Sequence, residues 1–294
     1  MVQRKGIGYW IFTLCNTLLM TAITLICLLP MVHVLFASFS DPTWVLNKSG
    51  LILWPHKASL EGYRLVFQNQ QLMSSYLNTF IYVFSATGIG LLVTVLGAYT
   101  LSRKDALFTG PIMLFVTFTM LFNGGLIPFY LVVTGLGLFD SMWAVILPTC
   151  VSAFNLILVR TAMLSIPASL EESAKLDGAG PMRILFSIVL PLVKATVATV
   201  ILYYAIAHWN AWFNASIFLR SRGKFPLQLI LREILISNDV SSISSSGEMA
   251  SIADTYKQLL KYCTIIVSTV PVLIFYPFIM KYFKSGVMIG SLKG

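Results

Sequence analysis

The stretch YLNTFIYVFSATGIGLLVTVLGAYTL, residues 76–101, contains no charged side chain. An α-helix of about 20 apolar residues is long enough to cross the hydrocarbon core of a bilayer. The whole chain has the same character, because 57% of its 294 residues are hydrophobic and only 11% are charged. A soluble domain carries about 25% charged residues. The sequence therefore predicts an all-α integral membrane protein.

Six stretches meet the same length requirement, so we expect a single transmembrane domain over residues 1–294 with six membrane-spanning helices. The predicted spans cover approximately residues 10–36, 76–101, 110–133, 142–163, 191–213 and 262–280. Basic residues are enriched in short cytoplasmic loops. By a narrow margin, their distribution here places both chain termini in the cytoplasm and the two long loops, 37–75 and 214–261, outside it.

The two outer loops differ in composition. Loop 37–75 mixes aromatic and polar residues and predicts a small packed cap. Loop 214–261 contains the serine-rich stretch SSISSSGEM, Ser241–Met249, which is typical of a flexible insert that meets a partner.

Charge and cysteine usage exclude several function classes. The net charge is +9, but no basic helix or aromatic-basic cluster accompanies it, so we expect no nucleic-acid partner. The four cysteines are far apart and match no disulfide or metal spacing. The chain also lacks the Gly-x4-Gly-Lys-Ser/Thr loop that holds nucleotide phosphates. We therefore expect no metal, no cofactor and no catalytic residue in this chain.

Charge returns between the fourth and fifth predicted spans, in residues 164–190. The stretch EESAKLDGAG, Glu171–Gly180, has three carboxylates and a lysine within seven residues. Ser169 and Glu172 have the spacing of a capping box, with Ser165 as an alternative cap. Glu171 and Lys175 lie one turn apart and can form an ion pair. This pattern predicts a short helix.

A second short helix is expected to follow after a sharp turn. Gly178 stands where a helix needs a left-handed residue to end, and Pro181 suits the first turn of the next helix. That helix, Pro181–Val189, has apolar residues on one side. We interpret the two helices as a hairpin that another protein binds, the alternative being a solvated loop without a special role.

The hairpin sequence resembles the EAA loop of ABC importer permeases, whose pattern is EAA, three residues, G, nine residues and I-x-L-P. Glu172-Ser-Ala174, Gly178 and Ile188-x-Leu190-Pro191 match this spacing at every position. Ser173 replaces the middle alanine, a small-for-small change.

The resemblance extends over the whole chain. It is to the sugar-importer permeases related to the smaller membrane subunit of the maltose transporter, and within them most to the subgroup for complex oligosaccharides. The stretches that carry it are FNGGLIPFY (Phe122–Tyr130), SIPASLEESAKLDGAG (Ser165–Gly180), HWNAWFNA (His208–Ala215) and KSGVMIGSLKG (Lys284–Gly294).

The resemblance implies a multi-pass permease of a bacterial plasma (inner) membrane, surrounded by lipid, with a cytoplasmic EAA coupling hairpin. It implies a second, related permease as a heterodimer partner, two ATPase subunits that bind ATP and Mg²⁺, an extracytoplasmic solute-binding protein, and a sugar or oligosaccharide as cargo. The tail Lys284–Gly294 would reach into the ATPase pair, unless it is a disordered end. The ATPase-coupling residues implied are Glu171, Glu172, Ser173, Ala174, Asp177, Gly178 and Ala179.

Neutral polar side chains in the spans are the candidates for the substrate pathway. The central turns of the spans carry no Asp or Glu, so ion coupling is not expected. Amides, hydroxyls and aromatic faces suit an uncharged or weakly charged glycan. Bonds between helices and interfacial aromatic belts are the structural alternatives. Residues 123–125, followed by Pro128, are expected to break the third span in a bend beside the cavity. The candidates are Asn78, Asn123, Asn155, Tyr203, Trp209, Asn210 and Trp212.

Two other function classes were weighed against the importer permease. An ion-coupled secondary transporter of a neutral solute needs an ion or proton site near the midplane and often internal repeats, and neither is visible. A membrane-bound enzyme needs paired carboxylates, a histidine cluster or a nucleophile. His33, His56 and His208 are scattered singly. The sequence therefore favours a non-catalytic transport subunit.

Overall fold

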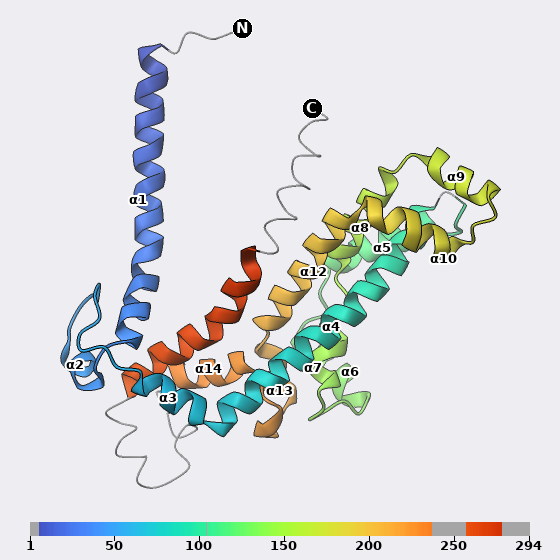
Figure 1. Cartoon of the computed structure of the whole chain (residues 1–294). Helices are drawn as coiled ribbons and strands as arrows, with labels where there is room; N and C mark the ends of the chain where they lie inside the picture. Colours follow the sequence, from blue (N-terminus) through green and yellow to red (C-terminus); the bar gives the residue numbers. More distant parts are fainter. Residues whose placement is uncertain (1–5, 104, 237–256, 278–294) are drawn as a thin grey trace. The chain divides into compact units, whose positions relative to one another are not determined.

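The computed structural model describes residues 6–103, 105–236 and 257–277, and these residues form helices joined by loops, without a strand (Figure 1). Three helices are long and apolar enough to cross a membrane: Ile7–Ser38, Gln70–Ser102 and Lys257–Pro277. Three pairs of helices, each bent at a short break, are also long and apolar enough if each pair is counted as one span, which allows up to six spans. The serine-rich stretch Ser241–Met249 and the tail Lys284–Gly294 lie outside the described residues.

The chain divides into two compact units. The first contains residues 1–70 and 233–269. Its helices are α1 (Ile7–Ser38), α2 (Pro42–Asn47), α3 (Glu61–Gln68) and most of Lys257–Pro277. Nearly all apolar side chains of α1 are exposed, as a lipid-facing span requires.

The loop between α1 and α3 is packed, as the sequence predicts for a small cap. Trp44 stacks on His56, with 4.8 Å between the ring centroids. Asp41 caps α2 by accepting from the Trp44 amide at 3.1 Å. His33 of α1 accepts a hydrogen bond from the Ile52 amide at 2.9 Å.

The second unit contains residues 71–232 and the chain from residue 270. Its helices up to the hairpin are α4 (Gln70–Ser102), α5 (Thr109–Leu121), α6 (Leu126–Gly135), α7 (Trp143–Ile146), the 3₁₀ turn η1 (Leu147–Thr149) and α8 (Ala153–Leu164). The remaining ones are α9 (Ala168–Leu176), α10 (Pro181–Ile184), the π-turn η2 (Leu185–Val189), α11 (Leu190–Leu192), α12 (Lys194–Trp209), α13 (Phe213–Phe218), the 3₁₀ turn η3 (Arg222–Lys224) and α14 (Leu227–Ile236).

Several predicted spans are bent helix pairs. The pair α5 and α6 bends by 117° at the predicted break, where Gly125 has a φ of +86°. The pair α7–η1 and α8 bends by 44°, and the chain turns by 86° between α11 and α12. Helix ends inside a membrane need partners for their free backbone groups.

The break before α8 has such a partner in Tyr204 of α12. The buried Tyr204 hydroxyl accepts from the Ser152 amide at 3.0 Å and bonds the Thr94 hydroxyl of α4 at 2.7 Å. One side chain therefore joins α4, α8 and α12 in the interior of the second unit.

Gly90 allows α4 to approach this break closely. A β-carbon at Gly90 would lie 2.0 Å from the carbonyl oxygen of Cys150, which is a backbone atom with little room to move. Gly88, two residues earlier on α4, has no heavy atom within 4 Å of the corresponding position.

We therefore expect Gly90→Ala to destabilise the folded protein by about 1–3 kcal/mol, the usual cost of overpacking a tight contact. The thermal midpoint of the purified protein in detergent checks this expectation. Gly88→Ala is the matched control, because it makes the same change in the same helix without a steric clash. Equal midpoints for the two variants would contradict the close approach.

Candidate functional site: a helical hairpin and an anchored turn

The segment between α8 and α12 forms a helix, a sharp turn and a second helix, as predicted (Figure 1). Gly178 has a φ of +78°, and the amide of Ala179 donates to the carbonyl of Ala174 at 2.9 Å. This is the bonding that ends a helix at a left-handed residue. Pro181 lies in the first turn of α10, where its missing N–H costs nothing.

The start of α9 differs from the prediction, because neither serine caps it. The helix begins at Ala168, after Pro167, and no side chain accepts from its first amides. Ser169 thus lies inside the first turn, and Ser165 bonds the carbonyl of Ala162 at 2.7 Å.

Arg103, just after α4, fixes the orientation of α9. Its guanidinium forms an ion pair with Glu171, and the two side chains are 16% and 13% exposed. It also lies over the ring of Tyr99, 4.1 Å from the centroid. Tyr99 donates to the carbonyl of Pro181 at 3.1 Å, so both arms of the hairpin are bonded to the end of α4. Burial lowers the pKa of Arg103 below its ordinary value.

The predicted pair between Glu171 and Lys175 is not formed. Lys175 pairs instead with Asp105 at 3.5 Å, in an exposed position. The pKa of Asp105 is lowered, first by its own backbone amide and then by the charge of Lys175. An exposed pair of this kind adds little stability, whereas the Arg103–Glu171 pair lies largely out of water.

The hairpin is packed on its inner side and open on its outer side. Ala174 is buried in the cluster that also holds Ile184 and Leu185, and Ala179 and Ile188 pack against that cluster. This matches the predicted apolar side of the second helix. Glu172, Ser173, Asp177 and Gly178 are exposed.

Two large apolar side chains of α9 also point away from the protein. Leu176 is 90% exposed and Leu170 is 45% exposed. Both lie on a charged helix that sequence analysis places outside the membrane, where lipid cannot cover them. The sequence analysis did not single them out, because a periodic pattern does not show which apolar face lacks a partner.

Three of the four asparagines predicted for the pathway form side-chain hydrogen bonds to backbone atoms of this chain. Asn78 of α4 donates to the carbonyl of Gly223 at 2.6 Å, and Asn210 donates to that of Ile206 at 2.9 Å. Asn123 accepts from the Gly125 amide at 2.9 Å, in the break between α5 and α6. Asn155, in the first turn of α8, is 4% exposed.

The three aromatic residues predicted for the pathway differ in burial and in the side chains that they contact. Trp209 is buried, with its ring centroid 5.5 Å from that of Phe80. Tyr203 is 40% exposed. Trp212 lies between α12 and α13, and the guanidinium of Arg232 in α14 is 3.9 Å from its ring centroid. Arg232 was not among the residues that the sequence analysis selected.

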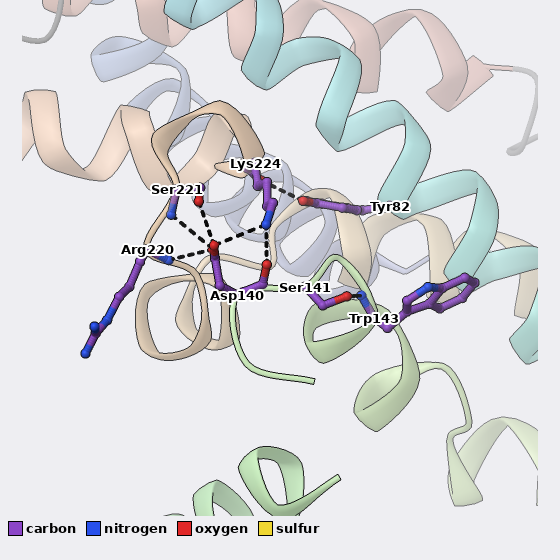
Figure 2. A network of polar contacts seen from close by, with 7 residues as sticks. All are labelled: Tyr82, Asp140, Ser141, Trp143, Arg220, Ser221 and Lys224. Atoms are coloured by element: carbon purple, nitrogen blue, oxygen red, sulfur yellow. Dashed lines mark hydrogen bonds and ion pairs between the residues drawn. The ribbon is translucent and has the colours of Figure 1, made fainter. Parts of the chain in front are cut away.

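The anchored turn comprises residues 219–225, and hydrogen bonds fix it from two sides. On one side Asp140 accepts hydrogen bonds from the amides of Arg220 and Ser221, both at 3.0 Å, and from the Ser221 hydroxyl at 2.6 Å (Figure 2). Lys224 pairs with the same carboxylate at 3.1 Å.

On the other side, α4 bonds the same turn. The Tyr82 hydroxyl donates to the carbonyl of Lys224 at 2.6 Å (Figure 2), and the Gln71 amide donates to that of Arg222 at 2.7 Å. The amide of Leu227, at the start of α14, donates to the hydroxyl of Thr79 at 2.8 Å. The turn therefore has a fixed position on the N-terminal half of α4.

Asp140 is the centre of this network, and its hydrogen bonds lower its pKa far below the usual 3.8. The bonds from Ser221 are the largest cause. A lowered pKa means that the carboxylate stabilises the fold above pH 3.8 and loses this effect only as the pH falls through the lower, folded value. Ordinary acidification to about pH 5 should therefore leave the turn intact.

We expect Asp140→Asn to lower the thermal midpoint at neutral pH. The amide can keep the left-handed backbone of this position, where φ is +53°, but it cannot pair with Lys224. The difference from the unchanged protein should become smaller in strong acid, where Asp140 itself protonates. Thermal scans from pH 7 downwards check this, and an equal difference at every pH would contradict an electrostatic role.

No protein-family model matches the chain. It is 44% identical over 270 residues to the polygalacturonan/rhamnogalacturonan transport system permease protein YtcP of Bacillus subtilis, a match that covers 92% of this chain and 94% of that one.

The chain is similar to solved structures of bacterial ABC transporters, among them the following two. One is a bacterial ABC transporter involved in the import of the acidic polysaccharide alginate, with a TM-score of 0.88, 32% identity, and coverage of 95% of this chain and 98% of that one. The other is a bacterial alginate ABC transporter in complex with a pentasaccharide-bound periplasmic protein, with a TM-score of 0.61 and coverage of 91% and 92%. At 15% identity the second supports the fold alone.

Proposed function

Because the chain belongs to the family of carbohydrate ABC transporter permeases, we propose that it forms half of the membrane pathway of an importer for acidic oligosaccharides. The observation that carries this proposal is the 44% identity, over nearly the full length of both chains, to a permease named for polygalacturonan and rhamnogalacturonan transport. The alginate transporter that shares the fold is likewise named for an acidic polysaccharide.

The proposed cargo differs from the sequence expectation of an uncharged or weakly charged glycan. That expectation came from the neutral side chains of the spans. The structure supports less weight on these side chains, because Asn78, Asn123 and Asn210 use their side-chain amides in hydrogen bonds to backbone groups of this chain. A cationic side chain, Arg232, lies beside Trp212 instead.

Energy coupling is proposed to occur at the hairpin formed by α9 and α10. The chain lacks a nucleotide-binding loop, so two separate ATPase subunits would bind ATP and Mg²⁺. The exposed residues Glu172, Ser173, Leu176 and Asp177 would meet a cleft of the ATPase. Glu171 has a different role in this proposal, because it holds the hairpin on α4 through Arg103.

The proposed topology places the hairpin in the cytoplasm and the anchored turn outside. The hairpin is bonded to Tyr99 of α4 and the turn to Asn78. A helix rises 1.5 Å per residue, so these points are about 30 Å apart, the thickness of the hydrocarbon core. This separation supports α4 as one complete span, with the hairpin and the turn on opposite sides of the membrane. From the family resemblance we further propose six spans with both termini in the cytoplasm, a second permease as partner, and a binding protein on the outer face.

Reconstitution of the complete transporter tests this function. The chain is purified with its second permease, the ATPases and the binding protein, and placed in proteoliposomes. We expect ATP-dependent uptake of trigalacturonate and no uptake when the ATPase is omitted. Uptake driven by an ion gradient without ATP would support a secondary transporter instead. Uptake of neutral trisaccharides only would overturn the acidic cargo.

A further inference from the structure

Arg232 and Trp212 form a cation–aromatic pair in the second unit. The guanidinium carbon of Arg232 lies 3.9 Å from the centroid of the indole ring, which is contact distance over the face. Phe213 packs edge-on against Trp212 at 5.5 Å between centroids. Phe213 therefore contacts the indole from a second direction, and the face of the indole provides a flat surface against which the guanidinium packs.

Arg232 is exposed and has no carboxylate partner among the described residues. This distinguishes it from Arg103, which pairs with Glu171, and from Lys224, which pairs with Asp140. A guanidinium that stacks on a ring keeps its N–H groups in its own plane, free at the edge. Those groups match the two oxygens of a carboxylate.

The position of Arg232 is set by the anchored turn. Leu227 begins α14 and bonds Thr79 of α4 through its amide. Arg232 lies five residues further along the same helix, about 7.5 Å from that anchor. The same residues that fix the turn therefore also fix the start of the helix that carries Arg232. A fixed cation loses little conformational entropy when it binds an anion.

The part of the protein that carries Arg232 is bonded to the end of α4 opposite the hairpin. In the proposed topology that is the extracytoplasmic end, where cargo enters. Trp212 is one of the residues predicted from the sequence to line the pathway. The sugar units of an acidic oligosaccharide carry a carboxylate as their distinguishing group.

We propose that Arg232 binds a carboxylate of an acidic oligosaccharide at the outer entrance of the pathway, with Trp212 as the residue that positions the guanidinium. This inference rests on the proposed function and assigns the selectivity for an acidic cargo to one site in this chain. Arg232 contacts the ligand, whereas Trp212 acts through Arg232.

The test is equilibrium binding of trigalacturonate to the purified transporter without its binding protein. Arg232→Gln should raise the dissociation constant about tenfold, the usual size for a lost bond between charged groups. Arg232→Lys should give a smaller rise, because a lysine keeps the charge and loses the planar fork. The methyl ester of trigalacturonate should bind all of these proteins equally.

Arg220→Gln is the matched control. Arg220 is also exposed, lies over an aromatic ring, that of Phe139 at 5.2 Å, and belongs to the anchored turn that precedes α14. We expect its replacement to change the dissociation constant by less than about twofold. An equal loss in the two variants would overturn a local site in favour of general attraction by positive charge.

Trp212→Phe and Trp212→Ala test the positioning role. The alanine variant should approach the affinity of Arg232→Gln for trigalacturonate, and adding Arg232→Gln to it should cause little further loss, since both act through one guanidinium. Thermal midpoints of all variants show whether each one is folded. Additive losses would overturn the positioning role.

Two further outcomes separate this inference from the function on which it rests. If the unchanged transporter takes up no acidic oligosaccharide, the proposed cargo itself is wrong. If uptake is present but Arg232→Gln binds trigalacturonate normally, only the assignment of Arg232 fails. Weaker association with the binding protein, with normal trigalacturonate binding, would reassign Arg232 to a protein contact and overturn the carboxylate site.

Discussion

Replacing Glu171 by Lys should detach the hairpin from α4 and abolish ATP-driven transport. The substitution puts a second cation against the Arg103 guanidinium, where the two side chains are only 16% and 13% exposed. Breaking a buried pair leaves an uncompensated charge, which costs about 3–5 kcal/mol. The readouts are the free energy of unfolding in detergent and transport by the reconstituted complex.

The reversed pair separates the loss of the contact from the loss of Glu171 itself. We expect Arg103→Glu combined with Glu171→Lys to recover part of the lost stability, because the pair is restored with opposite polarity. Glu172→Lys is the control for stability, since it makes the same charge change on the exposed side of the same helix. If the double variant were no more stable than either single one, the ion pair would not be what holds the hairpin.

The sequence predicted the parts of this protein that depend on local physics. Span length and composition predict helices that cross the membrane, and Gly178 and Pro181 predict a turn that the structure contains. Each of these inferences depends only on the backbone preference of a single residue or on the solvent that surrounds a helix. The break at Gly125 was predicted on the same grounds.

The inferences that failed depend on packing between distant segments. Glu171 was expected to pair with Lys175 because helix geometry brings them together, yet it pairs with Arg103, 68 residues earlier. The capping box failed because α9 starts at Ala168 with Pro167 as its N-cap, which puts Ser169 two residues inside the cap position. Arg232 of α14 was missed because its neighbour Trp212 lies 20 residues earlier, in the connection between α12 and α13.

Residue type alone also does not show which side chains line the substrate pathway. An asparagine in a span is equally suited to a cargo and to a nearby carbonyl, and the sequence does not show which one it faces. Asn78 bonds the carbonyl of Gly223, and this bond anchors the turn before α14. A residue selected for binding thus contributes to the position of the one cation that we assign to the cargo.

Leu176→Asp should abolish assembly with the ATPase while leaving the permease itself stable. Leu176 is 90% exposed at the end of α9, so the isolated chain gains almost nothing from it, and a surface change costs less than about 0.5 kcal/mol. At an interface with a partner, loss of a central apolar anchor costs about 2 kcal/mol or more, and a buried charge adds to this. Affinity should therefore fall at least about thirtyfold.

The measurement is the amount of ATPase that purifies with the permease pair, together with the thermal midpoint of the pair alone. Leu107→Asp is the matched control, because Leu107 is 81% exposed in the loop between α4 and α5 and lies outside the hairpin. Leu176→Met should retain assembly, since it keeps an apolar side chain of similar volume. Normal recovery of the ATPase with Leu176→Asp would show that the outer side of the hairpin is not the coupling surface, since no folding defect could then account for the result.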